Sequence, residues 1–218
     1  MKLNKIIIFY PSFEKGGVEK ILVNLINFIL TKNYEIILIS SNFKKQLIKK
    51  KKNFKYVNLN SKKNIFLNDR ISRSFSAYSK LREVLKEQKK DNFIVFSLQS
   101  SILAIIACKI LGHRHKVVVR NAEDPIYSAI YAENKIISYF VLFLKLIFYN
   151  FSDGIITNSK GSKFSLKKIL LNKNIEAIYN PYLKKISTRN KERRSDILLS
   201  VGRLTKQKDF RSLIFAFY

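Results

Sequence analysis

Residues 5–40, KIIIFYPSFEKGGVEKILVNLINFILTKNYEIILIS, decide the fold of this chain. This stretch begins with the apolar run Ile6–Tyr10, passes through a glycine-containing loop into a segment with helical spacing of Ile and Leu, and returns to an apolar run at Glu35–Ser40. A strand, an amphipathic helix and a second strand in this order form the basic unit of a parallel sheet.

The same alternation continues along the chain. Strands that alternate with helices form a parallel sheet with helices packed on both of its faces. We therefore predict an α/β fold with a doubly wound, Rossmann-like parallel sheet. Residues 101–111 are apolar nearly all round and should be buried, and Cys108 is expected to be a core thiol. The remaining strands are predicted at Phe54–Leu59, Phe93–Leu98, Lys116–Arg120, Gly154–Thr157, Ile175–Tyr179 and Ile197–Val201.

The domain organisation follows from a change in composition after residue 183. Residues 184–196 are rich in Lys, Arg, Asn, Ser and Thr and predict a linker between a first domain, residues 1–183, and residues 197–218. The last segment predicts one strand and a helix at Phe210–Tyr218, which is the start of an incomplete second domain. A single strand and helix bury too little surface to form a core of their own.

The charge of the chain favours anionic partners. Forty-two Lys and Arg residues against 15 Asp and Glu residues give a net charge of +27, although many lysines could simply be solvated. No helix-turn-helix, zinc-ligand or RNA-binding pattern occurs, so nucleic acid is not an expected partner. A single cysteine and the lack of a signal-peptide pattern favour a cytoplasmic location.

Two further segments bear on membrane binding. The apolar stretch Ile136–Phe148 is too short to span a bilayer and contains Lys145, so we expect a buried or interfacial helix. The basic run Lys44–Lys52 could act with this helix on an anionic membrane surface. The alternative is a solvated loop and a buried helix.

Two loops are candidates for phosphate binding. Gly16 and Gly17 lie between a predicted strand and a predicted helix, where free backbone N–H groups and the helix dipole favour an anion. Arg203 and Lys208 lie in a similar loop and add a guanidinium and an ammonium group. The alternatives are an ordinary flexible turn for the first loop and a solvated basic turn for the second.

These motifs, taken together, resemble those of a known enzyme family. Over essentially its whole length, and in the same order, the chain resembles the N-terminal part of retaining GT-B glycosyltransferases of the family-4 type. The last of the matching segments is the most specific. The segments are GGVEK at 16–20, FSDGIITNSKG at 151–161, IYNP at 178–181 and LLSVGRLTKQKDF at 198–210.

The resemblance implies roles for individual residues. Gly16, Gly17, Arg203 and Lys208 would bind the diphosphate of a nucleoside-diphosphate sugar, the donor substrate, and two cations there could replace a metal, so neither a metal nor a cofactor is expected. Ser159 is expected to cap the next helix. No catalytic residue is assigned. The acceptor-side candidates are Glu19, Arg120, Asn121 and Glu123, and for the last three a plain loop ending in an Asp-Pro turn is the alternative.

The chain departs from the family pattern in two places. Many members carry a histidine after the strand that corresponds to Lys116–Arg120, whereas His113 and His115 precede that strand here. The family's spaced pair of glutamates and its nucleotide pocket belong beyond Tyr218, so we interpret the chain as a fragment that should be inactive or nearly inactive alone.

The function implied is transfer of a hexose-type sugar, with retention, to a glycan or lipid-linked acceptor. Surface polysaccharide or lipopolysaccharide synthesis is the expected setting, at the inner face of the cell membrane. The alternative is a non-catalytic module that binds the acceptor or the membrane.

Overall fold

The computed structural model describes residues 4–13, 17–49, 52–59, 69–88, 92–110, 115–132, 134–171, 174–180, 197–202 and 209–217. The chain divides into two units, Met1–Pro181 and Tyr182–Tyr218, which are treated separately below.

The first unit is built on one parallel sheet of seven strands in the order β3-β2-β1-β4-β5-β6-β7. All neighbouring strands run parallel. The α/β fold class and the doubly wound, Rossmann-like sheet are therefore confirmed, as are the predicted strands of this unit. The strands span Lys5–Ser12 (β1), Glu35–Ser41 (β2), Phe54–Asn58 (β3), Phe93–Ser97 (β4), Lys116–Asn121 (β5), Gly154–Thr157 (β6) and Ile175–Ala177 (β7).

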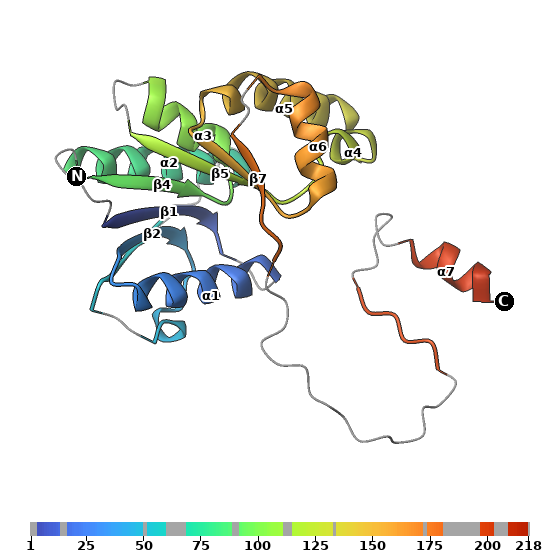
Figure 1. Ribbon diagram of the computed structural model, residues 1–218, viewed down its shortest axis with the longest axis horizontal. Helices are drawn as coiled ribbons and strands as arrows, with labels where there is room; N and C mark the ends of the chain where they lie inside the picture. The colour runs from blue at the N-terminus through green and yellow to red at the C-terminus, as the bar shows by residue number, and fades with distance from the viewer. Residues whose placement is uncertain are drawn as a thin grey trace. The chain divides into compact units, whose positions relative to one another are not determined.

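Helices cover both faces of this sheet (Figure 1). One face packs against α1, which buries Leu22, Ile26 and Leu30. The other face packs against α2, α3, η2 and α6, with part of α5. The helical segments of this unit are α1 (Gly17–Thr31), η1 (Lys45–Leu47), α2 (Asp69–Glu87), α3 (Ser101–Ile105), η2 (Ile106–Ile110), α4 (Pro125–Ile130), α5 (Lys135–Phe148), η3 (Tyr149–Phe151) and α6 (Lys160–Ile169).

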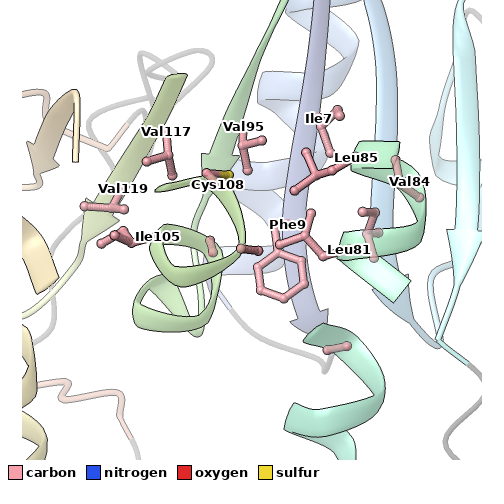
Figure 2. Close-up of a cluster of buried hydrophobic side chains, with 14 of the residues drawn as sticks. Ile7, Phe9, Leu81, Val84, Leu85, Val95, Ile105, Cys108, Val117 and Val119 are labelled. Atoms are coloured by element: carbon pink, nitrogen blue, oxygen red, sulfur yellow. The ribbon is translucent and has the colours of Figure 1, made fainter. Parts of the chain in front are cut away.

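The larger core lies on the α2 and α3 side of the sheet. Figure 2 shows Ile7 and Phe9 of β1 beside Leu81 of α2 and Cys108 of η2. Cys108 is fully buried, as predicted, and burial raises the pKa of its thiol to about 12. Apolar side chains alternate between the two faces of β1 because successive residues of a strand point to opposite sides.

Two sequence interpretations of helices have clear outcomes. Ser159 caps α6, because its Oγ accepts a hydrogen bond from the backbone N–H of Ser162 at 3.1 Å. The segment Ile136–Phe148 is helical as expected, and of the two alternatives for it, a buried or an interfacial helix, the buried one is wrong, since no residue of α5 is buried. Its apolar residues outnumber the positions that face the protein, so several point to solvent.

The second unit contains the helix α7 (Phe210–Phe217), which agrees with the predicted helix. The predicted strand at Ile197–Val201 is wrong: residues 197–201 have no regular secondary structure, and Val201 is 89% exposed. A strand is stable only when its backbone groups pair with a neighbouring strand. A single strand and helix supply no such neighbour. The boundaries at residues 183 and 196 remain predictions.

Candidate functional site

The carboxyl ends of β1 and β4 form the centre of the candidate site. The chain proceeds outward from β1 to β2 and β3 and then returns to β4, so the strand order reverses between β1 and β4. Ligands of open α/β sheets bind in the crevice at such a reversal. The backbone N–H of Ser12 donates to Gln99 Oε1 at 2.9 Å and thereby joins the loops that follow β1 and β4.

A strained residue lies in the loop after β4. Ser100 has a φ of 54°, in the left-handed region that residues other than glycine rarely adopt. Such strain occurs preferentially at functional sites. Ser12, Gln99 and Ser100 were missed by the sequence interpretation, although the signal available was simple, because all three are polar residues at or directly after the end of a strand.

The loop after β1 contains the predicted phosphate-binding glycines. Gly16 lies outside the described residues. Gly17 is the first residue of α1, and a Cβ built on it would meet no atom within 4 Å, so the space next to its backbone is open. Packing of the described residues therefore gives no reason for a glycine at position 17.

Glu19 holds the start of α1 to the end of β1. It is buried, and one of its carboxylate oxygens accepts a hydrogen bond from the Tyr10 hydroxyl at 2.8 Å. The first turn of a helix also favours a negative side chain because of the helix dipole. This geometry gives Glu19 a role in holding the loop between β1 and α1, and the acceptor-side role remains a prediction.

Arg120 lies at the end of β5 and is also buried. Its Nη2 donates to Asn180 Oδ1 at 2.6 Å, which connects β5 to the last described residue of the first unit. Nearby, Asn158 Nδ2 donates to the carbonyl of Ala122 at 2.6 Å. Side chains from the ends of β5, β6 and β7 therefore meet at the same edge of the sheet as Ser12 and Gln99.

The loop between β5 and α4 is held by its own side chains. Asn121 Nδ2 donates to the carbonyl of Glu123, and Glu123 accepts from the Ser128 hydroxyl at 3.0 Å. Asp124 caps α4 by accepting from the backbone N–H groups of Ile126 and Tyr127 at 3.0 and 3.2 Å. The alternative of a structural Asp-Pro turn thus describes the position of Asp124 well. Asn121 is buried, whereas Glu123 is exposed.

Lys145 adds a positive charge behind this loop. Burial lowers the pKa of Lys145, and the charge of Glu123 opposes that shift. At the amino end of β5, the ring of His115 lies against that of Phe93 in a tilted arrangement, with centroids 4.4 Å apart. Since the site lies at the carboxyl end of the strands, His115 lies away from it, as the sequence predicts.

The second predicted phosphate loop is only partly described. Arg203 and Lys208 lie outside the described residues. Asp209 Oδ1 accepts from the backbone N–H of Ser212 at 3.3 Å and begins α7. Within the described part of the chain, no group of three or more His, Cys, Asp and Glu side chains is arranged to hold a metal ion.

Comparison with known proteins adds family information to this geometry. The chain is 27% identical over 207 residues to a Campylobacter jejuni enzyme, the GalNAc-alpha-(1->4)-GalNAc-alpha-(1->3)-diNAcBac-PP-undecaprenol alpha-1,4-N-acetyl-D-galactosaminyltransferase. The match covers 94% of this chain and 54% of that enzyme. The chain thus spans about half the length of this relative.

Several solved structures share the fold. Sucrose-phosphate synthase from Thermosynechococcus elongatus superposes with a TM-score of 0.60 and 10% identity, over 82% of this chain and 48% of that one. The lipopolysaccharide outer core galactosyltransferase WaaB superposes with a TM-score of 0.53 and 20% identity, over 81% of this chain and 46% of that one. UDP-N-acetylglucosamine 2-epimerase from Rickettsia bellii superposes with a TM-score of 0.53 and 14% identity, over 82% of this chain and 45% of that one. An epimerase is among them, so the GT-B fold alone does not define the reaction.

The family is shown by the sequence. The family model described as Glycosyltransferase Family 4 matches residues 15–182, which include the loop after β1, the whole sheet from β2 to β7 and Asn180. This match covers more than half of the chain and contains every described residue that we place at the carboxyl edge except Tyr10 and Ser12. The chain therefore belongs to glycosyltransferase family 4 and has the GT-B type of fold.

Proposed function

We propose that this protein transfers a hexose-type sugar from a nucleoside-diphosphate sugar to a glycan or lipid-linked acceptor, with retention of configuration. The observation that carries the proposal is the family match over residues 15–182, which includes the polar carboxyl edge of the sheet. The Campylobacter jejuni relative, whose name gives a polyprenol-linked glycan as acceptor, supports a lipid-linked acceptor. A role in surface polysaccharide or lipopolysaccharide synthesis at the cytoplasmic side of the membrane is part of this proposal.

The first unit would provide the acceptor side of the site. Glu19 and Arg120 are buried and hydrogen-bonded, so their role would be to hold the loops that contact the acceptor. Asn121 is the last residue of β5, and Glu123 lies on the loop that follows. Of these residues, Glu123 is exposed and therefore accessible to a hydroxyl of an acceptor sugar.

The donor diphosphate would be bound by backbone groups and by two cations. The open space at Gly17 allows an anion to approach the first turn of α1. Arg203 and Lys208 would neutralise the charge that builds on the departing diphosphate, which is the reason why no metal or cofactor is proposed.

The test measures sugar transfer by the protein expressed from its own gene, with any coding sequence that adjoins Tyr218. A panel of nucleoside-diphosphate sugars is offered with a polyprenyl-diphosphate-linked glycan, and the anomeric configuration of the product is read by NMR. We expect an α-linked product from an α-linked donor. We expect the 218-residue chain alone to show little or no turnover, because it spans about half the length of the relative.

Three outcomes would contradict the proposal. A product of inverted configuration would exclude retention. Acceptor binding without turnover in any expressed form would favour the non-catalytic binding module. Activity that is lost when EDTA is added and restored by a divalent cation would contradict the metal-free diphosphate site. As a matched control, Lys32→Ala, at an exposed lysine at the end of α1, should leave turnover unchanged.

A further inference from the structure

One side of α5 presents a continuous apolar stripe to solvent. Ile136, Phe140, Phe143 and Ile147 recur at helical spacing, and their exposed fractions are 85, 59, 56 and 41%. The exposed sides of helices in globular proteins are normally polar. These four residues are called the outer face of α5 below.

The polarity of α5 is the reverse of that of an ordinary surface helix. Lys145, near its end, is half-buried, and burial lowers its pKa. Ser138 is also less exposed than the residues of the outer face. Lys135, at the start of α5, is exposed, but the rest of the outward surface of the helix consists mainly of large apolar side chains, which is costly in water unless another apolar medium covers them.

The apolar surface extends beyond these four residues. Ile137 and Tyr139 of α5 are exposed, as are Tyr127 of α4 and Tyr131, the residue that follows α4; α4 packs against α5. The rings of Tyr127 and Tyr131 stack with centroids 6.3 Å apart. At these exposures each aromatic side chain offers about half of its roughly 150–250 Å², so the surface reaches several hundred Å². Patches of this size mark protein or membrane contact sites.

Charge decides between the possible occupants. Residues 123–171, which contain α4, α5 and α6, hold six lysines and four acidic residues, a net charge of +2, and the whole chain has a net charge of +27. Asp153 forms an ion pair with Lys109 at 2.8 Å and so adds no free negative charge. A second copy of this chain would carry the same +27 charge and repel the first, whereas an anionic lipid surface would attract it.

We infer that α5 lies in the headgroup region of an anionic membrane with its outer face inserted among the acyl chains. Helices of this kind lie along the membrane interface, where tyrosines such as Tyr139 are also favoured. No described helix is long and apolar enough to cross a bilayer. The inference deepens the proposed function, because a lipid-linked acceptor would be met at the same surface.

The basic run Lys44–Lys52 does not belong to this membrane surface. Ile48, within that run, packs in the core cluster on the α1 side of the sheet, whereas Leu146 and Phe148 of α5 pack on the opposite side. The sequence interpretation of one joint surface formed by the run and the helix is therefore wrong. The reason is topological: the run follows β2 and the helix follows β5, and these two crossovers lie on opposite faces of the sheet.

The experiment measures co-sedimentation of the 218-residue chain with lipid vesicles in the absence of any sugar nucleotide. We expect binding to vesicles that contain phosphatidylglycerol, weaker binding to pure phosphatidylcholine, and release by salt. The double variant Phe140→Gln with Phe143→Gln should bind the anionic vesicles at least about tenfold more weakly, because two large apolar side chains are removed from the interface. Circular dichroism and thermal unfolding confirm that the variant is folded.

Two control variants make the test specific. Phe28→Gln changes an aromatic residue that is 60% exposed on α1, on the other side of the sheet, and should bind within about twofold of the parent chain. Lys49→Gln with Lys52→Gln should likewise retain most of the binding. Loss of binding in these controls as large as that in the Phe140 and Phe143 variant would overturn the inference.

Two further results would contradict membrane binding through the outer face of α5. Undiminished vesicle binding by the folded Phe140 and Phe143 variant would overturn the inference. So would concentration-dependent dimerisation without lipid that this variant abolishes, because α5 would then contact a second copy. The assay contains no donor or acceptor, so it tests membrane binding independently of sugar transfer. Vesicle binding can be observed if the proposed sugar transfer is not, and sugar transfer can be observed if vesicle binding is not.

Discussion

The hydrogen bond between Tyr10 and Glu19 is expected to stabilise the loop between β1 and α1 and hence the folded chain. Tyr10→Phe keeps the ring and removes only the hydroxyl that donates to the Glu19 carboxylate at 2.8 Å. Both residues are buried, so water cannot readily replace the lost donor. A hydrogen bond to a charged group contributes about 1.5–3 kcal/mol, and we expect the free energy of unfolding to fall by about 2 kcal/mol.

The assay is thermal and urea unfolding of the 218-residue chain and its variants at pH 7. For a protein of this size, a loss of about 2 kcal/mol lowers Tm by roughly 4–8 °C. Glu19→Gln retains an acceptor for the Tyr10 hydroxyl and should lose less, about 1 kcal/mol. Tyr127→Phe removes the hydroxyl of an exposed tyrosine and should stay within about 0.5 kcal/mol of the parent chain.

A double-mutant cycle measures the part of this interaction that depends on the negative charge of Glu19. The combined Tyr10→Phe and Glu19→Gln variant should be more stable than the sum of the two single changes predicts, by about 1 kcal/mol or more. If Tyr10→Phe is as stable as the parent chain, or loses no more than Tyr127→Phe, the hydrogen bond does not hold this loop. In that case the acceptor-side role of Glu19 would be the better interpretation.

Four further expectations can be checked independently. Burial raises the pKa of the Cys108 thiol from 9.0 to about 12, so the folded chain holds this proton more tightly than the unfolded chain. The free energy of unfolding should therefore decline as the pH rises above about 9. A thiol reagent at pH 8 should label Cys108 only on unfolding. Ser159→Ala, which removes the cap of α6, should lower the unfolding free energy by about 1 kcal/mol in urea titrations. In an active form of the protein, Arg203→Ala should reduce turnover far more than stability, and equal turnover on a nucleotide sugar would show that Arg203 does not bind the diphosphate. Brief trypsin treatment should cut first within residues 184–194, whereas first cleavage between residues 54 and 98 would contradict the predicted linker.

The sheet of the first unit could be predicted because its strands are buried on both faces. Such strands appear in the sequence as continuous apolar runs, of which Ile6–Tyr10 is a clear example. The same pattern failed at Ile197–Val201, since apolar composition does not supply the neighbouring strand that pairing requires. Local signals identify a segment that suits a strand, and tertiary contacts decide whether it becomes one.

The candidate site was predictable in position but not in detail. The carboxyl ends of strands could be located from the sequence, and Glu19, Arg120 and Asn121 lie at or close to such ends, while their acceptor-side roles remain predictions. Their orientations depend on partners that no local pattern reveals: Arg120 bonds to Asn180, which is 60 residues away in the sequence. For α5 the sequence left a buried and an interfacial helix open for a related reason, since helical spacing gives the composition of each face without saying which face the protein covers.

The pairing of β1 with both β2 and β4 has a consequence for synthesis on the ribosome. β1, α1 and β2 leave the exit tunnel before α2 and β4, which cover the other side of β1, and can associate before these are made. Until then Ile7 and Phe9, fully buried in the finished protein, have no covering helix and an open strand edge beside them. Proteins with such long-range parallel pairing fold slowly and expose aggregation-prone edges. Yield in cells should therefore depend on a chaperone that binds the nascent chain during the interval between β2 and β4.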